Sequence, residues 1–173
     1  FFADLRPFLP HLKRGRFFGG EPFLTPESRR VWELMIEDGL STECHVTTNG
    51  SQYNRAVERY LDALPFHLTV SIDGATKETV EKIRVNSGYE RLLENIRRFR
   101  DYAAGKGTSF HLAFCLMRQN WHEFADLLLL AEDLGVVVLV NTVIDPSFCS
   151  LYTLPRAELK RIASALEAQD ATL

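Results

Sequence analysis

The chain has 173 residues, of which 46% are hydrophobic and 25% charged, and this balance is ordinary for one globular domain with a sizeable core. Its 20 basic and 23 acidic side chains give a formal net charge of −3. Such a charge provides no basic surface for nucleic acid or an anionic membrane. Because no apolar run approaches the roughly 20 residues that span a bilayer, we expect neither kind of partner.

The three cysteines, Cys44, Cys115 and Cys149, are too few and too widely spaced for a disulfide framework or a metal motif. Apolar neighbours suggest that they are small buried hydrophobic residues in a reducing compartment. The sequence therefore predicts a cytoplasmic protein.

Helical and strand-like segments alternate along the chain. Apolar periodicity predicts an opening helix over Phe2–Leu12, kinked at Pro7. A strand over Gly15–Phe18 follows, and Thr25 is a suitable N-cap for a helix that begins at Pro26 and ends at Asp38-Gly39. The next segments are predicted in the order strand, helix, strand, helix, helix: Glu43–Thr48, Tyr53–Leu64, Phe66–Ile72, Thr76–Val85 and Tyr89–Ala104.

The second half of the chain continues the alternation. A strand over Ser109–Met117 precedes a helix over Trp121–Leu134, for which Asn120 is the expected N-cap. Gly135–Val140 is a continuous apolar run, which favours a strand buried on both faces. A last amphipathic helix starts near Leu154-Pro155.

Five strands separated by helical crossovers imply an α/β fold with parallel pairing. A closed eight-stranded barrel needs about 250 residues, so a partial barrel or a curved parallel sheet fits this length better.

Small polar residues follow three of the strands. They are Gly19-Gly20-Glu21-Pro22, Thr47-Thr48-Asn49-Gly50 and Ser71-Ile72-Asp73-Gly74. Because ligands bind at the carboxyl ends of parallel strands, these turns predict a site for a small polar ligand. Each could also be a plain Gly-Gly, Asn-Gly or Asp-Gly turn.

These three motifs, in this order and spacing, resemble the core of the radical S-adenosylmethionine (SAM) superfamily, in the SPASM/twitch-like branch of sulfatase-maturing and peptide-modifying enzymes. The likeness runs from about Phe17 to about Pro155. It implies a parallel partial (β/α)6 TIM-like barrel, whose first strand would lie upstream of Phe1. The Phe17 strand would then be an unpaired edge.

The resemblance implies SAM and a [4Fe–4S] cluster as cofactors. In this family the reduced cluster splits SAM, and the resulting 5′-deoxyadenosyl radical abstracts a hydrogen from the substrate. The Gly19, Gly20, Glu21 and Pro22 turn would receive the amino group of SAM. Side chains alternate along a strand, so Ser71 and Asp73 would share a face and could bind ribose hydroxyls or the methionyl group.

The resemblance also implies further contacts to SAM, whose residues it identifies less closely. Asn49 would shape the loop around the cofactor. Arg84 or Arg91 would pair the SAM carboxylate, and Arg118 is a third candidate. Val140 would lie on the strand that stacks on adenine.

The family holds its cluster with a C-x3-C-x2-C motif upstream of the Gly-Gly-Glu-Pro turn, and residues 1–173 contain no such motif. We therefore expect the cluster cysteines upstream of Phe1 in a longer protein, and no metal ligand or identified catalytic residue within this chain. We divide it into a barrel core, residues 1–155, and a C-terminal helix, residues 156–173. The expected partners are SAM, a peptide or protein substrate, and an electron donor such as flavodoxin or ferredoxin.

Two alternatives remain. One is a half-barrel without a cluster that serves as a non-catalytic binding module. The other is a generic (β/α) enzyme with Glu21 and Asp73 as an acid–base pair. The histidines suggest no site, because His45 and His67 lie inside predicted strands as expected core or interface residues.

Overall fold

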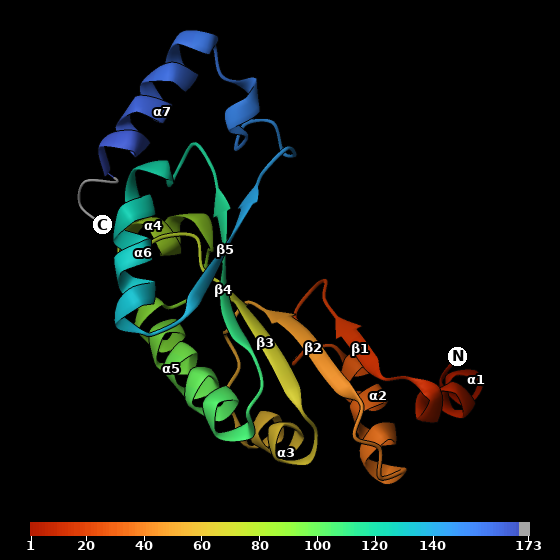
Figure 1. Cartoon of the computed structure of the whole chain (residues 1–173). Helices are drawn as coiled ribbons and strands as arrows, with labels where there is room; N and C mark the ends of the chain where they lie inside the picture. The colour runs from red at the N-terminus through yellow and green to blue at the C-terminus, as the bar shows by residue number, and fades with distance from the viewer. Residues whose placement is uncertain (170–173) are drawn as a thin grey trace. The chain divides into compact units, whose positions relative to one another are not determined.

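The computed structural model describes residues 1–169 of the chain. Its five strands belong to one open parallel sheet with the order β1-β2-β3-β4-β5 (Figure 1). The strands are β1 (Arg14–Phe17), β2 (Glu43–Thr48), β3 (Phe66–Ser71), β4 (Phe110–Leu116) and β5 (Val137–Thr142). The predicted α/β fold with a partial parallel barrel is confirmed, and β1 is an edge strand of the described sheet, as expected.

The α-helices lie close to their predicted positions. They are α1 (Phe2–Leu5), α2 (Pro26–Glu37), α3 (Arg55–Ala63), α4 (Lys77–Ile83), α5 (Tyr89–Lys106), α6 (Phe124–Asp133) and α7 (Arg156–Gln169). Three 3-10 helices complete the chain: η1 (Arg6–His11), η2 (Trp121–Glu123) and η3 (Leu151–Thr153).

The prediction of a single opening helix over Phe2–Leu12 is wrong, because the segment contains two helices of different types. Only α1 is α-helical, and Arg6–His11 form a 3-10 helix that contains Pro7 and Pro10. A proline has no amide hydrogen for the α-helical bond, so two of them in one turn prevent a continuous helix. The amide of Leu12 instead donates to the Leu9 carbonyl at 3.1 Å.

Two predicted helix caps also differ from the structure. Thr25 and Asn120 occupy the N-cap positions of α2 and η2, but neither side chain caps its helix. Thr25 donates its hydroxyl to the Glu21 carbonyl at 2.8 Å. The Asn120 side-chain oxygen accepts from the Met117 amide. In both cases the side chain uses another partner in place of the helix amide that the sequence pattern favours. Asn54, by contrast, accepts from the amides of Ala56 and Val57 and caps α3.

The chain divides into two compact units, Phe1–Val70 with Glu94–Phe110, and Ser71–Leu93 with His111–Leu173. The first contains β1, β2, α2 and α3, and most of β3 and α5. Its core centres on Trp32 of α2, which is fully buried against Phe17, Phe23, Tyr60 and Phe66. Ring centroids 5.1 to 5.4 Å apart lie within the favourable range for aromatic pairs.

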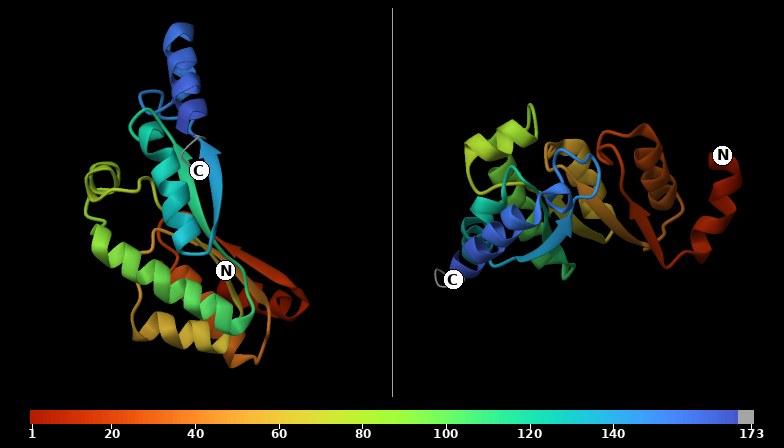
Figure 2. Two further views of the ribbon diagram at one scale, coloured as in Figure 1. Left: turned by 60° about the vertical axis from the view of Figure 1, so that its left-hand side comes forward. Right: turned by 90° about the horizontal axis from the view of Figure 1, so that it is seen from above.

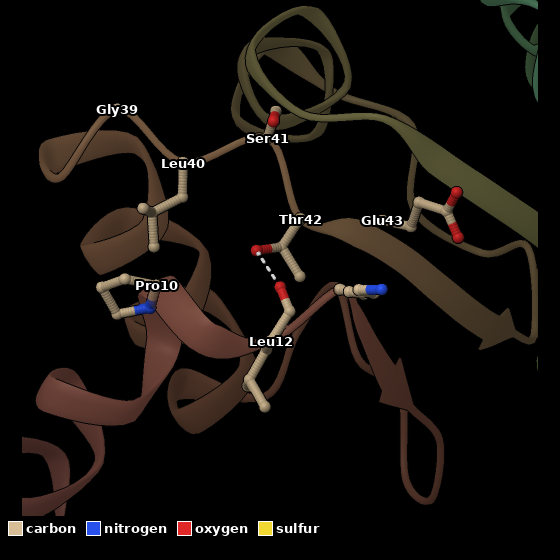
Figure 3. A pocket seen from close by; sticks show the side chains of 8 residues that line it. Pro10, Leu12, Gly39, Leu40, Ser41, Thr42 and Glu43 are labelled. Carbon is tan, nitrogen blue, oxygen red and sulfur yellow. Dashed lines mark hydrogen bonds between the residues drawn. The ribbon is translucent and has the colours of Figure 1, made fainter.

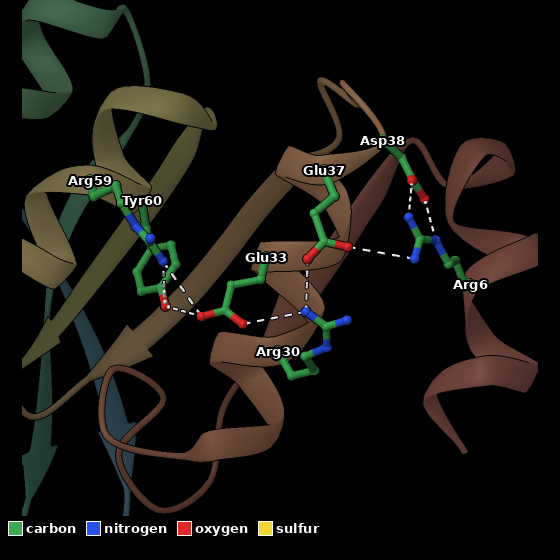
Figure 4. A network of polar contacts seen from close by, with 7 residues as sticks. All are labelled: Arg6, Arg30, Glu33, Glu37, Asp38, Arg59 and Tyr60. Carbon is green, nitrogen blue, oxygen red and sulfur yellow. Dashed lines mark hydrogen bonds and ion pairs between the residues drawn. The ribbon is translucent and has the colours of Figure 1, made fainter.

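A surface network joins η1, α2 and α3 within this first unit (Figure 4). Arg6 pairs with Asp38 and Glu37, Arg30 bridges Glu37 and Glu33, and Glu33 accepts from the Tyr60 hydroxyl at 3.1 Å. Exposed ion pairs contribute little to stability individually. The network orients the helices around the aromatic core.

The second unit contains α4, α6, α7 and β5, and most of β4. Helix α6 runs alongside β5 (Figures 1 and 2). Helix α7 packs on η2 and α6, where Gln169 accepts from the Ala125 amide and donates to the His122 carbonyl. The boundary expected after residue 155 stays a prediction.

The apolar run before Asn141 is not buried on both faces, so that prediction is wrong. Val137, Leu139 and Val140 are 59%, 44% and 45% exposed. Strand β5 is an edge strand with one neighbouring strand in the described sheet, and only Val138 in its apolar run is half-buried. No helix of the described residues is long and apolar enough to cross a membrane.

Replacing the central aromatic of the first unit should cost much of its stability. We expect Trp32→Ala to lower the free energy of unfolding by about 3–5 kcal/mol, because it leaves a large cavity among four rings. Urea unfolding followed by far-UV circular dichroism measures the change. Phe18→Ala is the control, since Phe18 is 74% exposed. An equal effect of both substitutions would contradict this account of the core.

Candidate functional site

The first motif is an exposed turn after β1 that only glycine accommodates well. Gly19 and Gly20 have φ angles of 86° and 59°, in the left-handed region. An added Cβ at Gly19 would meet nothing within 4 Å, and one at Gly20 would meet only the Thr25 hydroxyl at 3.8 Å. Because both glycines are exposed, a ligand can approach their backbone closely. The expected contact of this backbone with the SAM amino group stays a prediction.

Glu21 ties this turn to the turn after β2. Its carboxylate is buried and accepts three hydrogen bonds, from the Thr48 hydroxyl at 2.7 Å, the Asn49 amide at 2.7 Å and the Phe23 amide at 3.2 Å. Both oxygens therefore have partners inside the protein. Glu21 positions the loop, and its carboxylate is not presented as a free acid or base.

The second motif is a hydrogen-bonded Asx turn. Asn49 accepts from the Ser51 amide through its side-chain oxygen at 2.8 Å, and Gly50 has a φ angle of 71°. The Gly50 carbonyl accepts from the buried Asn95 side chain of α5 at 2.7 Å. Asn95 is a positioning residue that the sequence reasoning missed, since it looks like any polar residue in a helix. The Asn49 side chain shapes this turn, and its expected role around the cofactor stays a prediction.

The third motif belongs to the second unit and centres on a buried ion pair. Asp73 is 3% exposed and receives both Nε and Nη2 of Arg84 at 2.7 Å. Its other oxygen accepts from the Cys115 amide at 3.0 Å. Arg84 was predicted to pair the SAM carboxylate, and here its guanidinium neutralises a carboxylate of the protein. Any contact of Arg84 with SAM must use its remaining donors.

Two further buried side chains hold the loop that contains Asp73. Asn120 donates to the carbonyls of Asp73 and Cys115, at 3.0 and 2.8 Å, and accepts from the Met117 amide. Glu123 accepts from the amides of Ala75 and Thr76, which follow the motif. Sequence reasoning treated Asn120 as a helix cap and gave Glu123 no role. Its only signal was a Glu in an otherwise apolar helix turn.

The carboxylate of Glu123 remains ionised although it is buried. Burial alone would raise its pKa, but hydrogen bonds from the hydroxyls of Thr76 and Thr79 and from the two backbone amides outweigh that effect. The pKa of Glu123 is therefore lowered from its ordinary value of 4.5. A Cβ on Gly74 would come within 2.9 Å of this carboxylate and within 2.8 Å of Thr79, so glycine is required there.

The remaining predicted contacts are dispersed. Ser71 ends β3 and is half-buried. Arg118 donates to the Ser150 carbonyl at 2.9 Å and to the Thr153 hydroxyl, which leaves it anchored to the η3 segment. Arg91 and Val140 are exposed. Their roles toward SAM stay predictions.

The cysteines of residues 1–169 are separate free thiols and form no cluster site. Burial raises the pKa of Cys44 to about 12, and it also raises the pKa of Cys115. Protonated thiols are poor metal ligands. These cysteines do not fit a [4Fe–4S] cluster, so its ligands would have to come from outside residues 1–173.

A pocket of about 430 Å³ lies at the other end of the strands (Figure 3). It is lined by the segments that precede β1 and β2, and the Thr42 hydroxyl inside it donates to the Leu12 carbonyl at 3.1 Å. It contains none of the motif residues. Its size alone does not identify a site.

Removing the charge of Glu21 should loosen both loops that it joins. We expect Glu21→Gln to lower the free energy of unfolding by about 1–3 kcal/mol, because an amide NH₂ replaces one buried acceptor oxygen. Urea unfolding measures the loss. The exposed Glu132→Gln is the matched control, with an expected effect within about 0.5 kcal/mol. A loss no larger than that of Glu132→Gln would refute the bracing role.

The stabilising effect of Glu123 should depend on pH. A carboxyl group with a lowered folded-state pKa stabilises fully above its unfolded pKa, and this contribution is lost as pH falls through the folded pKa. We expect Glu123→Gln to destabilise most at pH 7 and progressively less below about pH 4.5. Urea unfolding across this range measures the difference. A difference that stays constant with pH would contradict the prediction.

Comparisons with known proteins identify the family of this chain. A family model described as "Radical SAM superfamily" matches residues 4–131. A relative named "Probable GTP 3',8-cyclase", from Methanocaldococcus jannaschii, is 26% identical over 127 residues, which are 73% of this chain and 41% of the relative. The GTP 3',8-cyclase of Aliarcobacter butzleri is 28% identical over 85 residues, which are 49% of this chain and 26% of that enzyme.

Solved structures show the same fold. SuiB of Streptococcus suis, bound to S-adenosylmethionine, matches with a TM-score of 0.63 and 12% identity over 95% of this chain and 39% of SuiB. A radical SAM methyltransferase of Sphaerobacter thermophilus matches with a TM-score of 0.55 and 19% identity, over 91% of this chain and 49% of that enzyme. The chain spans less than half the length of each of these relatives. The family match covers most of the chain, and the chain therefore belongs to the radical SAM superfamily, whose members use SAM and a [4Fe–4S] cluster.

Proposed function

We propose that the whole protein cleaves SAM reductively and uses the resulting radical to abstract hydrogen from a peptide or protein substrate. The observation that carries this proposal is the family match over residues 4–131, which contains all three strand-end motifs. When bound, the cluster and SAM supply the 5′-deoxyadenosyl radical. The protein binds and orients the cofactor and the substrate, and it excludes solvent.

In this proposal the chain supplies contacts to SAM and not to the cluster. The exposed backbone of Gly19 and Gly20 accepts from the SAM amino group, while Glu21 holds that turn in place. Ser71 is the hydroxyl that the fold leaves half-buried at the end of β3. Asp73 is compensated by Arg84, so this pair can orient polar groups of SAM without leaving a buried charge unpaired.

The structure disfavours the generic acid–base alternative. Glu21 accepts three internal hydrogen bonds, and Asp73 is held by Arg84 and the Cys115 amide. Proton transfer would require either carboxylate to leave these partners. The proposal also includes an electron donor such as flavodoxin or ferredoxin, and a cytoplasmic location where the thiols stay reduced.

The peptide substrate is supported by the fold. SuiB has also been solved with its precursor peptide SuiA, and that structure matches 89% of this chain with a TM-score of 0.63. A nucleotide substrate is the second candidate, because the two sequence relatives are GTP 3',8-cyclases. The whole protein, assayed anaerobically for 5′-deoxyadenosine with GTP or with synthetic peptides encoded beside its gene, separates the two. If GTP stimulated the formation of 5′-deoxyadenosine and were itself consumed, a nucleotide substrate would replace the peptide proposal.

Residues 1–173 alone should bind SAM but should not cleave it. We expect a calorimetric titration to show binding that Ser71→Ala weakens by about tenfold, since one lost hydrogen bond corresponds to about 1.4 kcal/mol. Ser164→Ala, on the exposed surface of α7, is the control. With dithionite under anaerobic conditions, we expect 5′-deoxyadenosine from the whole protein only. Turnover by residues 1–173 alone would show that the cluster needs no outside ligands.

A further inference from the structure

Three side chains of the kinds that bind metal ions lie on the face of β2 and β3 that is opposite to the core. The side chains of Glu43, His45 and His67 each offer one ligand atom, and these atoms all lie within 4.8 Å of one another. Cys44 and Val46, which alternate with them on β2, are buried in the core. Parallel pairing places His45 directly beside His67.

The expectation that both histidines are satisfied core or interface residues fails for His45, while Nδ1 of His67 has partners in Ser109. Both side chains are only half-buried, yet Nε2 of His45 is inaccessible and has no hydrogen-bond partner among the described residues. It lies 3.5 Å from the Glu43 carboxylate, and the two imidazole rings stack at 4.5 Å with an angle of 5°. A buried nitrogen without a partner is costly, and a ligand would remove that cost.

The contact between His67 and Ser109 must reverse before a metal can bind. The Nδ1 atom of His67 lies 2.9 Å from the Ser109 hydroxyl and accepts from the Ser109 amide at 3.2 Å, so the ring proton is on Nε2. Metal binding through Nε2 needs the other tautomer, in which Nδ1–H donates to the hydroxyl oxygen and the Ser109 amide loses this acceptor. The hydroxyl would then fix that tautomer, as outer partners of metal-binding histidines do.

Arg14 competes with a metal for Glu43, since its Nε lies 3.2 Å from Oε2 of Glu43. A metal must share that carboxylate with Arg14 or use the other oxygen.

We propose that Glu43, His45 and His67 bind a zinc ion, with a fourth position open to water. Two imidazoles and one carboxylate suit zinc better than calcium or magnesium, which prefer oxygen ligands. Tetrahedral zinc needs ligand atoms about 3.4 Å apart, so the side chains must close in by about 1 Å. No cysteine takes part, and the site is independent of SAM and its cluster.

Titration of the purified, metal-free chain with Zn²⁺ and Co²⁺ tests the site. We expect one ion per chain and a Co²⁺ absorption spectrum without thiolate charge-transfer bands. His45→Asn or His67→Asn should weaken binding at least 100-fold, and Ser109→Ala about 10-fold. His11→Asn and His122→Asn are matched controls outside the group and should bind as the unmodified chain does.

Arg14→Gln provides a test in the opposite direction. It removes the competing cation and should tighten Zn²⁺ binding, while circular dichroism verifies that each variant is folded. Unchanged affinity in both His45→Asn and His67→Asn, or thiolate bands in the Co²⁺ spectrum, would overturn the proposal. SAM binding should be the same with and without Zn²⁺, so failure of this site and failure of the proposed function are distinguishable.

Discussion

The loops of this protein depend on buried carboxylates that accept hydrogen bonds from backbone amides and hydroxyls. A turn at the end of a parallel strand leaves several amides without a partner, and burying them unpaired is costly. Glu21 satisfies the amides of Phe23 and Asn49, and Glu123 satisfies those of Ala75 and Thr76. In each unit one buried glutamate therefore organises the loop where ligands of this fold class bind.

This arrangement changes how the motif residues are understood. In the Gly-Gly-Glu-Pro turn, the backbone of the glycines is exposed while the glutamate faces inward. In the Ser-Ile-Asp-Gly turn, Asp73 is compensated by Arg84 at 2.7 Å. The charged residues hold the loops in place, while the backbone of Gly19 and Gly20 remains accessible to a ligand. Rigid support of this kind preorganises a binding site.

The face of β2 and β3 opposite to the core shows a different use of polar residues. Glu43, His45 and His67 are spread over 25 positions of sequence with no metal-binding spacing, and only the parallel register brings His45 beside His67. Side-chain alternation then places all three on one face. Sequence spacing detects metal sites whose ligands share one loop or helix, and it misses those assembled across strands.

The sequence by itself determined the order of strands and helices, the parallel pairing and the position of the three turns, because periodicity, glycines and chain length are local or additive signals. It failed where other partners compete for the same side chain: the Thr25 hydroxyl bonds the Glu21 carbonyl and the Asn120 oxygen bonds the Met117 amide, so neither caps its helix. It also failed at β5, which is exposed at an edge of the described sheet. Only the tertiary structure decided that Arg84 faces Asp73, that Asn95 and Glu123 hold the loops, and that two histidines meet. Those contacts join residues far apart in sequence, and no local pattern encodes such a pairing.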